Sequence, residues 1–278
     1  MRILKIITIA LCLTLWPLNL YLANTQPDFV TYLIPAVLVT ISFFLYKKYP
    51  NYYLIPIIFI GLFEKKLLPL SIIFCLFELL NKFNKKTLVL VIISFLIFLL
   101  NIPAYRGQTI FNKDYEAEQL ILRNIHLYPN AILARIFQNK LRIYINKAAD
   151  NFFALTDPNN YFFGFHPRPI SINNQNLFKY PFLAIVFFLY GIFYIGECKD
   201  KKFIIFAFLS SLVSLIILQN FDRNDFILWL PVSLVIVHGI KKLSLKNQKI
   251  FTTISVLLIL FALPEFLRSF VQKALIAK

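Results

Sequence analysis

Three short clusters hold most of the polar side chains that could carry out chemistry in this sequence. The first cluster, Asp157, His166 and Arg168, lies in an aromatic stretch. A guanidinium and an imidazole beside aromatic rings can bind the phosphate of a lipid-linked substrate, and His166 can transfer a proton near neutral pH. A structural role fits equally, because Asp157 can form an Asx turn before Pro158 while Arg168 reaches lipid phosphates.

The second cluster contains Asp222, Arg223 and Asp225, directly before an apolar run at residues 226–240. Charges this dense at the start of a membrane helix can face a cavity between helices. A plain hydrophilic turn would have the same composition. Both interpretations stay open, and we treat the three residues as candidates for substrate binding.

The third cluster places Lys65 and Lys66 after Glu64, between short apolar runs at residues 52–63 and 67–80. Charges between incomplete membrane spans are costly near lipid and often mark a polar cavity. If both runs cross the membrane, the same residues form an exposed turn. Lys65 and Lys66 are therefore further candidates for substrate binding.

No recognisable catalytic or metal-binding motif accompanies these clusters. The sequence contains no nucleophile elbow, phosphate-binding loop or Cys/His spacing typical of a metal site. Cys12 and Cys75 lie inside apolar runs and Cys198 lies in a short loop, which argues against a disulfide framework. The catalytic residue stays unknown, and we expect no metal and no cofactor.

The amino-acid composition indicates that the chain is embedded in a lipid membrane. Of the 278 residues, 59% are hydrophobic and only 15% are charged, whereas soluble domains are about a quarter charged. A single soluble core could not bury so many apolar side chains. Helices can present them to lipid while satisfying their own backbone hydrogen bonds. The sequence therefore predicts an all-α fold, a polytopic transmembrane helix bundle with a helical extracytoplasmic segment.

The formal charge of +16 reflects membrane topology and not nucleic-acid binding. Basic pairs such as Lys47-Lys48 and Lys241-Lys242 lie between apolar runs. With the N-terminus inside, most such charges fall on inner loops, where they meet anionic lipid headgroups. We expect a multi-pass protein of the cytoplasmic (inner) membrane, with a cytoplasmic N-terminus, membrane lipids as partners and no nucleic acid.

Nine apolar runs set the expected number of membrane helices at about nine, with seven to nine compatible with the pattern. The runs are residues 3–23, 29–46, 52–63, 67–80, 88–102, 181–196, 203–218, 226–240 and 250–267. Several are shorter than the roughly 20 residues that span hydrocarbon. Residues 52–80 in particular are either two short spans or a re-entrant hairpin.

The runs divide the chain into N-terminal membrane helices (1–102), an extracytoplasmic segment (103–179) and C-terminal membrane helices (180–278). The first run resembles a signal peptide. Tyr21 suits a small-residue cleavage site poorly, however, so we expect an uncleaved first helix.

The extracytoplasmic segment is expected to contain two helices. Asn112 can cap the first, whose first turn carries Asp114, Glu116 and Glu118. Asn130 can cap a second helix of about six turns, on which apolar residues recur at helical spacing. They are Leu133, Phe137, Leu141, Tyr144, Ala148 and Phe152. Such an amphipathic helix either lies along the membrane interface or caps the bundle.

Three short stretches resemble the GT-C-type polytopic membrane glycosyltransferases. Residues 61–70 (GLFEKKLLPL) resemble the place where such enzymes put a Lys between two apolar runs before a Pro. Residues 26–28 (QPD) are similar to the Pro-Asp turn before a mid-chain helix, and residues 222–231 (DRNDFILWLP) resemble the start of a late helix. The likeness covers the middle and C-terminal part of such enzymes. Residues 157–168 separately resemble a segment of uncharacterised multi-pass bacterial membrane proteins, which implies no function.

The resemblance to GT-C enzymes implies hexosyl transfer from a polyprenyl-phosphate sugar at the outer face of the membrane. The basic residues that would bind the phosphate are Lys65, Lys66, His166, Arg168 and Arg223. The family's catalytic Asp or Glu lies in a long first outer loop. The corresponding loop here is residues 24–28, so the resemblance names no base.

A non-enzymatic class competes with the glycosyltransferase hypothesis. A membrane scaffold, assembly factor or export-complex subunit would use the amphipathic helix to bind a protein partner. A transporter is a third alternative. The apolar runs carry no isolated charge near their centres for a proton relay, which argues against proton coupling.

Overall fold

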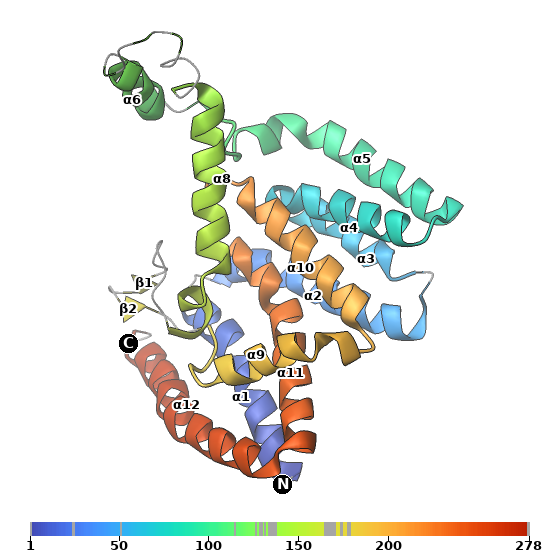
Figure 1. The fold of residues 1–278 in the computed structure, drawn as a ribbon, viewed down its shortest axis with the longest axis vertical. Helices are drawn as coiled ribbons and strands as arrows, with labels where there is room; N and C mark the ends of the chain where they lie inside the picture. Colours follow the sequence, from blue (N-terminus) through green and yellow to red (C-terminus); the bar gives the residue numbers. More distant parts are fainter. Residues whose placement is uncertain are drawn as a thin grey trace.

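The chain folds almost entirely into helices in a computed structural model (Figure 1). The structure describes residues 2–23, 26–50, 52–113, 115–125, 127, 130, 132, 138–163, 171–172, 175–176 and 179–276. Within these ranges the only strands are two short ones, β1 (Ser171–Ile172) and β2 (Gln175–Asn176), which pair antiparallel with Ser171 opposite Asn176. The predicted all-α class is confirmed.

The longer helices run through the chain in the following order. They are α1 (Arg2–Ala23), α2 (Gln26–Lys48), α3 (Leu54–Phe63), α4 (Leu68–Asn81), α5 (Lys85–Arg106), α6 (Tyr115–Ile125), α8 (Lys140–Thr156), α9 (Ala184–Phe193), α10 (Lys201–Ile216), α11 (Trp229–Lys246) and α12 (Gln248–Ile276). Four short helical turns join them: η1 (Lys65–Leu67), η2 (Asn159–Phe163), η3 (Ile195–Glu197) and η4 (Asn224–Leu228).

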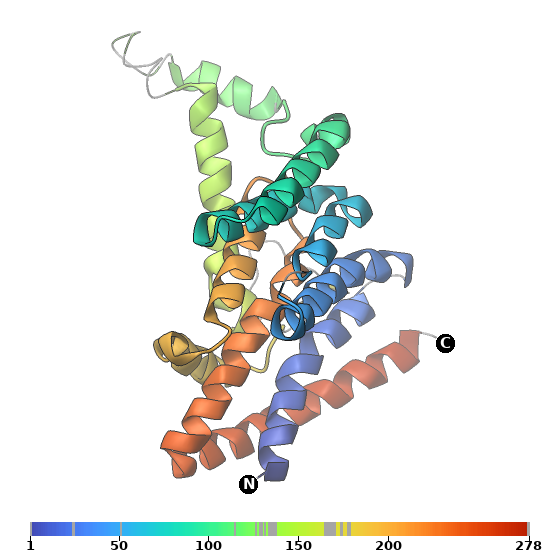
Figure 2. The same ribbon diagram turned by 90° about the vertical axis from the view of Figure 1, so that its right-hand side faces the viewer.

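The helices pack as two groups joined by α2, α10 and η4. The hairpin of α3 and α4 packs against α5 and α10, while α1, α9, α11 and α12 form the second group. Figures 1 and 2 show the α3–α5 group to one side of the α9–α11 pair. Large buried aromatic side chains, including Phe74, Phe187, Phe203 and Phe226, fill the interior between these helices.

Four helical segments of the described residues are long and apolar enough to cross a membrane, judged by length and composition. They are Arg2–Tyr21, Phe29–Lys48, Lys85–Arg106 and Asn224–Lys246. The expected count of about nine is not confirmed. α3, α4, α9 and α10 have 10, 14, 10 and 16 residues. They are therefore about 15–24 Å long, short of the roughly 30 Å of hydrocarbon.

The α3–η1–α4 segment is a closely packed helical hairpin. Gly61 lies so close to Leu68 that a Cβ would come within 2.7 Å of that side chain. Tyr53, just before α3, meets the ring of Phe203, and Asn81 at the end of α4 accepts a hydrogen bond from Lys202. Both ends of the hairpin thus lie beside the start of α10. Two short spans and a re-entrant hairpin both place their two ends on one side, so the structure is compatible with either alternative.

The tightest helix pair, α9 with α11, depends on two glycines. A Cβ on Gly239 would overlap the backbone oxygen of Phe187, and one on Gly191 would overlap the backbone oxygen of Val235. The two contacts run in opposite directions along the chain, so the helices are antiparallel. Small residues permit this close backbone approach, as in other membrane helix pairs.

Within the segment predicted to be extracytoplasmic (103–179), α8 projects from the bundle and α6 lies at its far end (Figures 1 and 2). The first expected helix is present as α6, with Glu116 and Glu118 in its first turn. The second expected helix is interrupted. The Asn130 Oδ1 atom accepts the N–H of Ile132 at 2.8 Å, as expected of a cap, and Ile132 is helical. Gln138 and Asn139 form a bend, and the Asn139 Oδ1 atom accepts the N–H of Arg142 at 2.9 Å at the start of α8. Within the predicted helix, residues 133–137 lie outside the described part.

Polar contacts gather the helix ends into two sets. One set joins ends predicted to be inner: Lys47 pairs with Asp200 at 3.0 Å, and the Lys5 Nζ atom donates to Ser244 at 3.1 Å. The other set joins ends predicted to be outer, since the Asn151 Nδ2 atom donates to the backbone oxygen of Leu218 at 2.7 Å. The grouping of ends inferred from charge is therefore consistent with the contacts.

Candidate functional site: a buried ion pair where two turns meet the bundle

A buried lysine and a buried aspartate form an ion pair just before α9. The side chains of Lys179 and Asp225 are only 7% and 1% exposed. The Lys179 Nζ atom donates to the Oδ2 atom of Asp225 and to the Oδ1 atom of Asn160. Burial lowers the pKa of the Lys179 ammonium from its ordinary value of 10.5, although Asp225 and Asp222 oppose the shift.

Aromatic rings surround the ammonium group of this pair. The Lys179 Nζ atom lies 5.1 Å from the ring centroid of Trp16 and 5.2 Å from that of Tyr161. Such cation–π contacts stabilise a cation that has lost its water. Trp16 also meets Tyr180 and Phe226 edge to face, at 5.4 and 5.7 Å between centroids. The rings therefore fix the position of the charge and exclude solvent from it.

The turn after α8 and the turn before α9 meet at this point. α8 ends where the Asp157 Oδ1 atom accepts the N–H of Asn159 at 2.9 Å, an Asx turn before η2. η2 then carries Asn160 and Tyr161 into the interior. The backbone N–H of Tyr180 donates to the oxygen of Tyr161 at 2.8 Å, which holds the two turns side by side.

A turn with a strained backbone at Arg223 positions Asp225. Arg223 has φ of 67°, in the left-handed region that costs a residue other than glycine about 1–3 kcal/mol. The turn starts η4, whose residues Asn224 to Leu228 are all buried. Strain of this kind persists only where surrounding contacts compensate for it. The ion pair of Asp225 is one such contact.

Several polar atoms of this site have no hydrogen-bond partner among the residues that the structure describes. They are the Asn160 Nδ2 atom, the Asp225 Oδ1 atom and both side-chain polar atoms of Asn224. Unsatisfied buried groups are costly and uncommon. Asn160 and Asp225 both contact Lys179, so their free donor and free acceptor lie in the same cluster. A hydroxyl group could satisfy both, by accepting from Asn160 and donating to Asp225.

The structure brings together parts of two of the three predicted clusters. Asp225 lies at the centre of the site, and Asp222 and Arg223 are partly exposed in the same turn. Asp157 is partly buried at the start of the turn that carries Asn160. His166 and Arg168 lie outside the described residues.

The third predicted cluster lies elsewhere. Lys65 is exposed and Lys66 is partly buried on η1, where the Glu64 Oε1 atom accepts the N–H of Lys66 at 3.1 Å. η1 packs against α5 and α10. In the described part of the chain, no side-chain hydrogen bond or ion pair joins these lysines to the Lys179–Asp225 pair.

Sequence reasoning missed Lys179, Asn160 and Trp16. The available signal was Lys179 itself, a lone cation directly before the apolar run at residues 181–196, opposite an acid-rich turn that precedes another run. If the predicted outer ends of the runs at residues 181–196 and 226–240 are considered together, the cation before one and the acids before the other predict an ion pair. Nothing in the sequence marks Asn160 or Trp16 as its neighbours.

The chain matches no protein-family model, no curated protein and no solved structure. Within the described residues, no group of three or more His, Cys, Asp or Glu side chains is placed to hold a metal ion.

Proposed function

We propose that this chain is an integral membrane protein related to the GT-C glycosyltransferases, and that it handles a polyprenyl-phosphate-linked sugar at the outer face of the bacterial cytoplasmic membrane. In this proposal the N-terminus is cytoplasmic. The buried Lys179–Asp225 pair is the observation that carries it. Asp225 belongs to the stretch at residues 222–231 that resembles the start of a late helix in those enzymes.

The polar groups near the pair suit such a ligand. Arg223 supplies a guanidinium at the partly exposed edge of the site, and guanidinium groups bind phosphate oxygens well. The free Asn160 donor and the free Asp225 acceptor suit a sugar hydroxyl. In the proposal Arg223 binds the phosphate, together with His166 and Arg168.

The proposal assigns no catalytic base. One oxygen of the Asp225 carboxylate is engaged by Lys179, so this residue is expected to bind and orient a ligand. Whether the chain performs hexosyl transfer is decided by an activity measurement with a lipid-phosphate donor.

Substitution of Arg223 by alanine tests the proposal directly. We expect binding of polyprenyl phosphate by the full-length protein to weaken about tenfold or more, since a charge-assisted hydrogen bond contributes about 1.5–3 kcal/mol. Lys82→Ala is the matched control, because it removes a cation just after α4, at an end predicted to be inner. Unchanged binding in Arg223→Ala, His166→Ala and Arg168→Ala, with unchanged cell-surface glycans, would refute the proposal.

The projecting α8 helix favours a second candidate, a non-enzymatic scaffold or export-complex subunit. Leu141, Ile145 and Phe153 are 62%, 57% and 67% exposed on it, and exposed apolar side chains often mark a protein interface. In that case Leu141→Ser with Ile145→Ser releases a stoichiometric partner, while Arg223→Ala leaves the complex intact. The opposite pattern favours the glycan-related function.

A further inference from the structure

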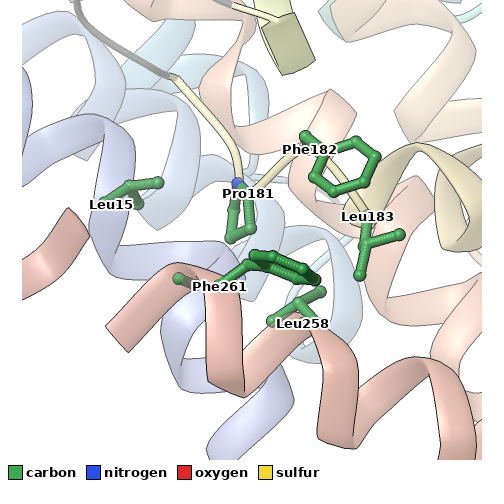
Figure 3. A pocket seen from close by; sticks show the side chains of 7 residues that line it. Leu15, Pro181, Phe182, Leu183, Leu258 and Phe261 are labelled. Atoms are coloured by element: carbon green, nitrogen blue, oxygen red, sulfur yellow. The ribbon is translucent and has the colours of Figure 1, made fainter. Parts of the chain in front are cut away.

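An apolar pocket of about 150 Å³ lies between α1, α12 and the segment that leads into α9 (Figure 3). All seven residues that line it are apolar: Leu15, Pro181, Phe182, Leu183, Leu258, Phe261 and Ala262. The pocket therefore draws on three parts of the chain that are far apart in sequence. None of these residues belongs to the predicted polar clusters.

The pocket has a buried floor and an exposed aromatic rim. Leu15, Leu258 and Ala262 are almost fully buried, whereas Phe182 and Phe261 are exposed. The rings of these two phenylalanines meet edge to face, 6.2 Å between centroids. Figure 3 shows the Pro181–Leu183 segment on one side of the pocket and Phe261 with Leu258 on the other. The opening thus lies on the outward surface of α12.

Water is a poor occupant of this pocket. A bound water needs two to four polar partners, and an apolar cavity of about 150 Å³ stays dry and accepts a benzene-sized molecule. The lining side chains offer no hydrogen-bonding group. Pro181 also removes a backbone donor at the point where the chain forms the wall. A hydrocarbon is the ligand that this lining fits.

We propose that the pocket holds the end of one acyl chain of a membrane phospholipid. α1 contains a candidate membrane span, and α12 carries an apolar helical stretch at Gln248–Pro264. Around the opening, Leu257, Leu260 and Leu263 of α12 are exposed. In a bilayer this surface is solvated by acyl chains, which are the most abundant hydrocarbon present. The inference does not depend on the proposed glycan-related function.

An acyl chain in this pocket would support the walls of the buried ion pair. Leu15 precedes Trp16, whose ring lies over the Lys179 ammonium, and Pro181 follows Tyr180, which packs on Trp16. Dispersion contacts between the acyl chain and Leu15 or Pro181 therefore stabilise the positions of the neighbouring rings that surround the Lys179 ammonium. The lipid acts as a structural ligand next to the site.

Photolabelling with a phospholipid tests the assignment. The full-length protein is reconstituted in phosphatidylglycerol and phosphatidylethanolamine vesicles that contain a phospholipid with a diazirine at the acyl-chain end. We expect labelling of the peptide that contains Leu258 and Phe261 to fall about tenfold in Ala262→Phe, because a phenyl ring fills a benzene-sized cavity. Ala10→Phe, on an exposed position of α1, should leave the labelling unchanged.

A second variant keeps the test informative if Ala262→Phe folds poorly. Phe261→Ala removes one side of the exposed rim, so labelling at Leu258 should increase. Equal labelling of this peptide in the wild type, Ala262→Phe and Phe261→Ala would overturn the proposal. Loss of acyl labelling on addition of a trace of polyprenyl phosphate would also overturn it, because the occupant would then be an isoprenoid chain.

Discussion

The two sets of helix-end contacts differ most clearly in the burial of their charges. Among the ends predicted to be inner, Lys47 and Asp200 are 49% and 24% exposed, and the pair formed by Lys242 and Glu197 is also solvent-accessible. At the opposite ends, Lys179 and Asp225 are almost completely buried.

This difference in burial implies that the two kinds of ion pair contribute differently to the stability of the fold. Exposed ion pairs contribute about 0–1 kcal/mol and are screened by salt. A buried pair gives little net stability, yet removal of one partner costs about 3–5 kcal/mol, because the other charge is left without compensation. The exposed pairs therefore contribute little to the packing, whereas the buried pair fixes how residues 157–163 and 179–180 join the bundle.

Removal of the buried carboxylate should give the largest effect. Asp225→Ala leaves Lys179 buried without its counter-ion, and we expect the free energy of unfolding to fall by about 3–5 kcal/mol. Titration with SDS in mixed micelles, followed by circular dichroism, measures this change. Asp222→Ala, in the same turn but partly exposed, is the control. Equal losses in the two variants would show that burial of Asp225 does not decide the effect.

Replacement of both partners should give a smaller loss than replacement of one. In Lys179→Met with Asp225→Leu no unpaired charge remains, and we expect a coupling energy of about 1–3 kcal/mol in a double-mutant cycle. The same SDS titration applies. Strict additivity of the two single variants would contradict a direct interaction between them.

The pH dependence of stability should reveal the buried lysine. Burial lowers the pKa of Lys179, so between that lowered value and 10.5 the unfolded chain binds more protons than the folded one. Stability from this group therefore rises with pH in that window, by at most about 1.4 kcal/mol per unit. The slope, measured in micelles, should decrease in Lys179→Met.

Removal of an exposed pair should give the smallest effect. Lys47→Ala and Glu197→Gln should each change the free energy of unfolding far less than Asp225→Ala does, and the change should shrink at high salt. A loss as large as that of Asp225→Ala would abolish the distinction between the two sets.

Local patterns predicted the parts of the fold that depend on one segment alone. The apolar run at residues 88–102, flanked by Lys85 and Lys86, became α5, and the acidic first turn at Glu116 and Glu118 became the start of α6. Residue type identified Asn130 as a cap, and its Oδ1 atom accepts the N–H of Ile132. The bend at Gln138 and Asn139 was not predicted, because Asn139 also fits the polar face of one continuous helix.

Of the two residues at the centre of the site, the sequence predicted only one. Asp225 was among the candidates because its turn is dense in charge. Its partner Lys179 comes from another segment, and only the hydrogen bonds that Lys179 donates to Asn160 on η2 and Asp225 on η4 reveal it. The aromatic residues around the ammonium were hidden among 31 Phe and 14 Tyr residues, most of which are expected in lipid or in the core.

The glycine contact between α9 and α11 bears on the order in which the chain enters the membrane during synthesis. α9 is ten residues long, about 15 Å, and cannot span the hydrocarbon layer unaided. Its closest neighbour, Gly239, is made later, on α11. We therefore expect α9 to remain in the insertion machinery or at the membrane surface until α11 arrives, and the two helices to enter as a pair.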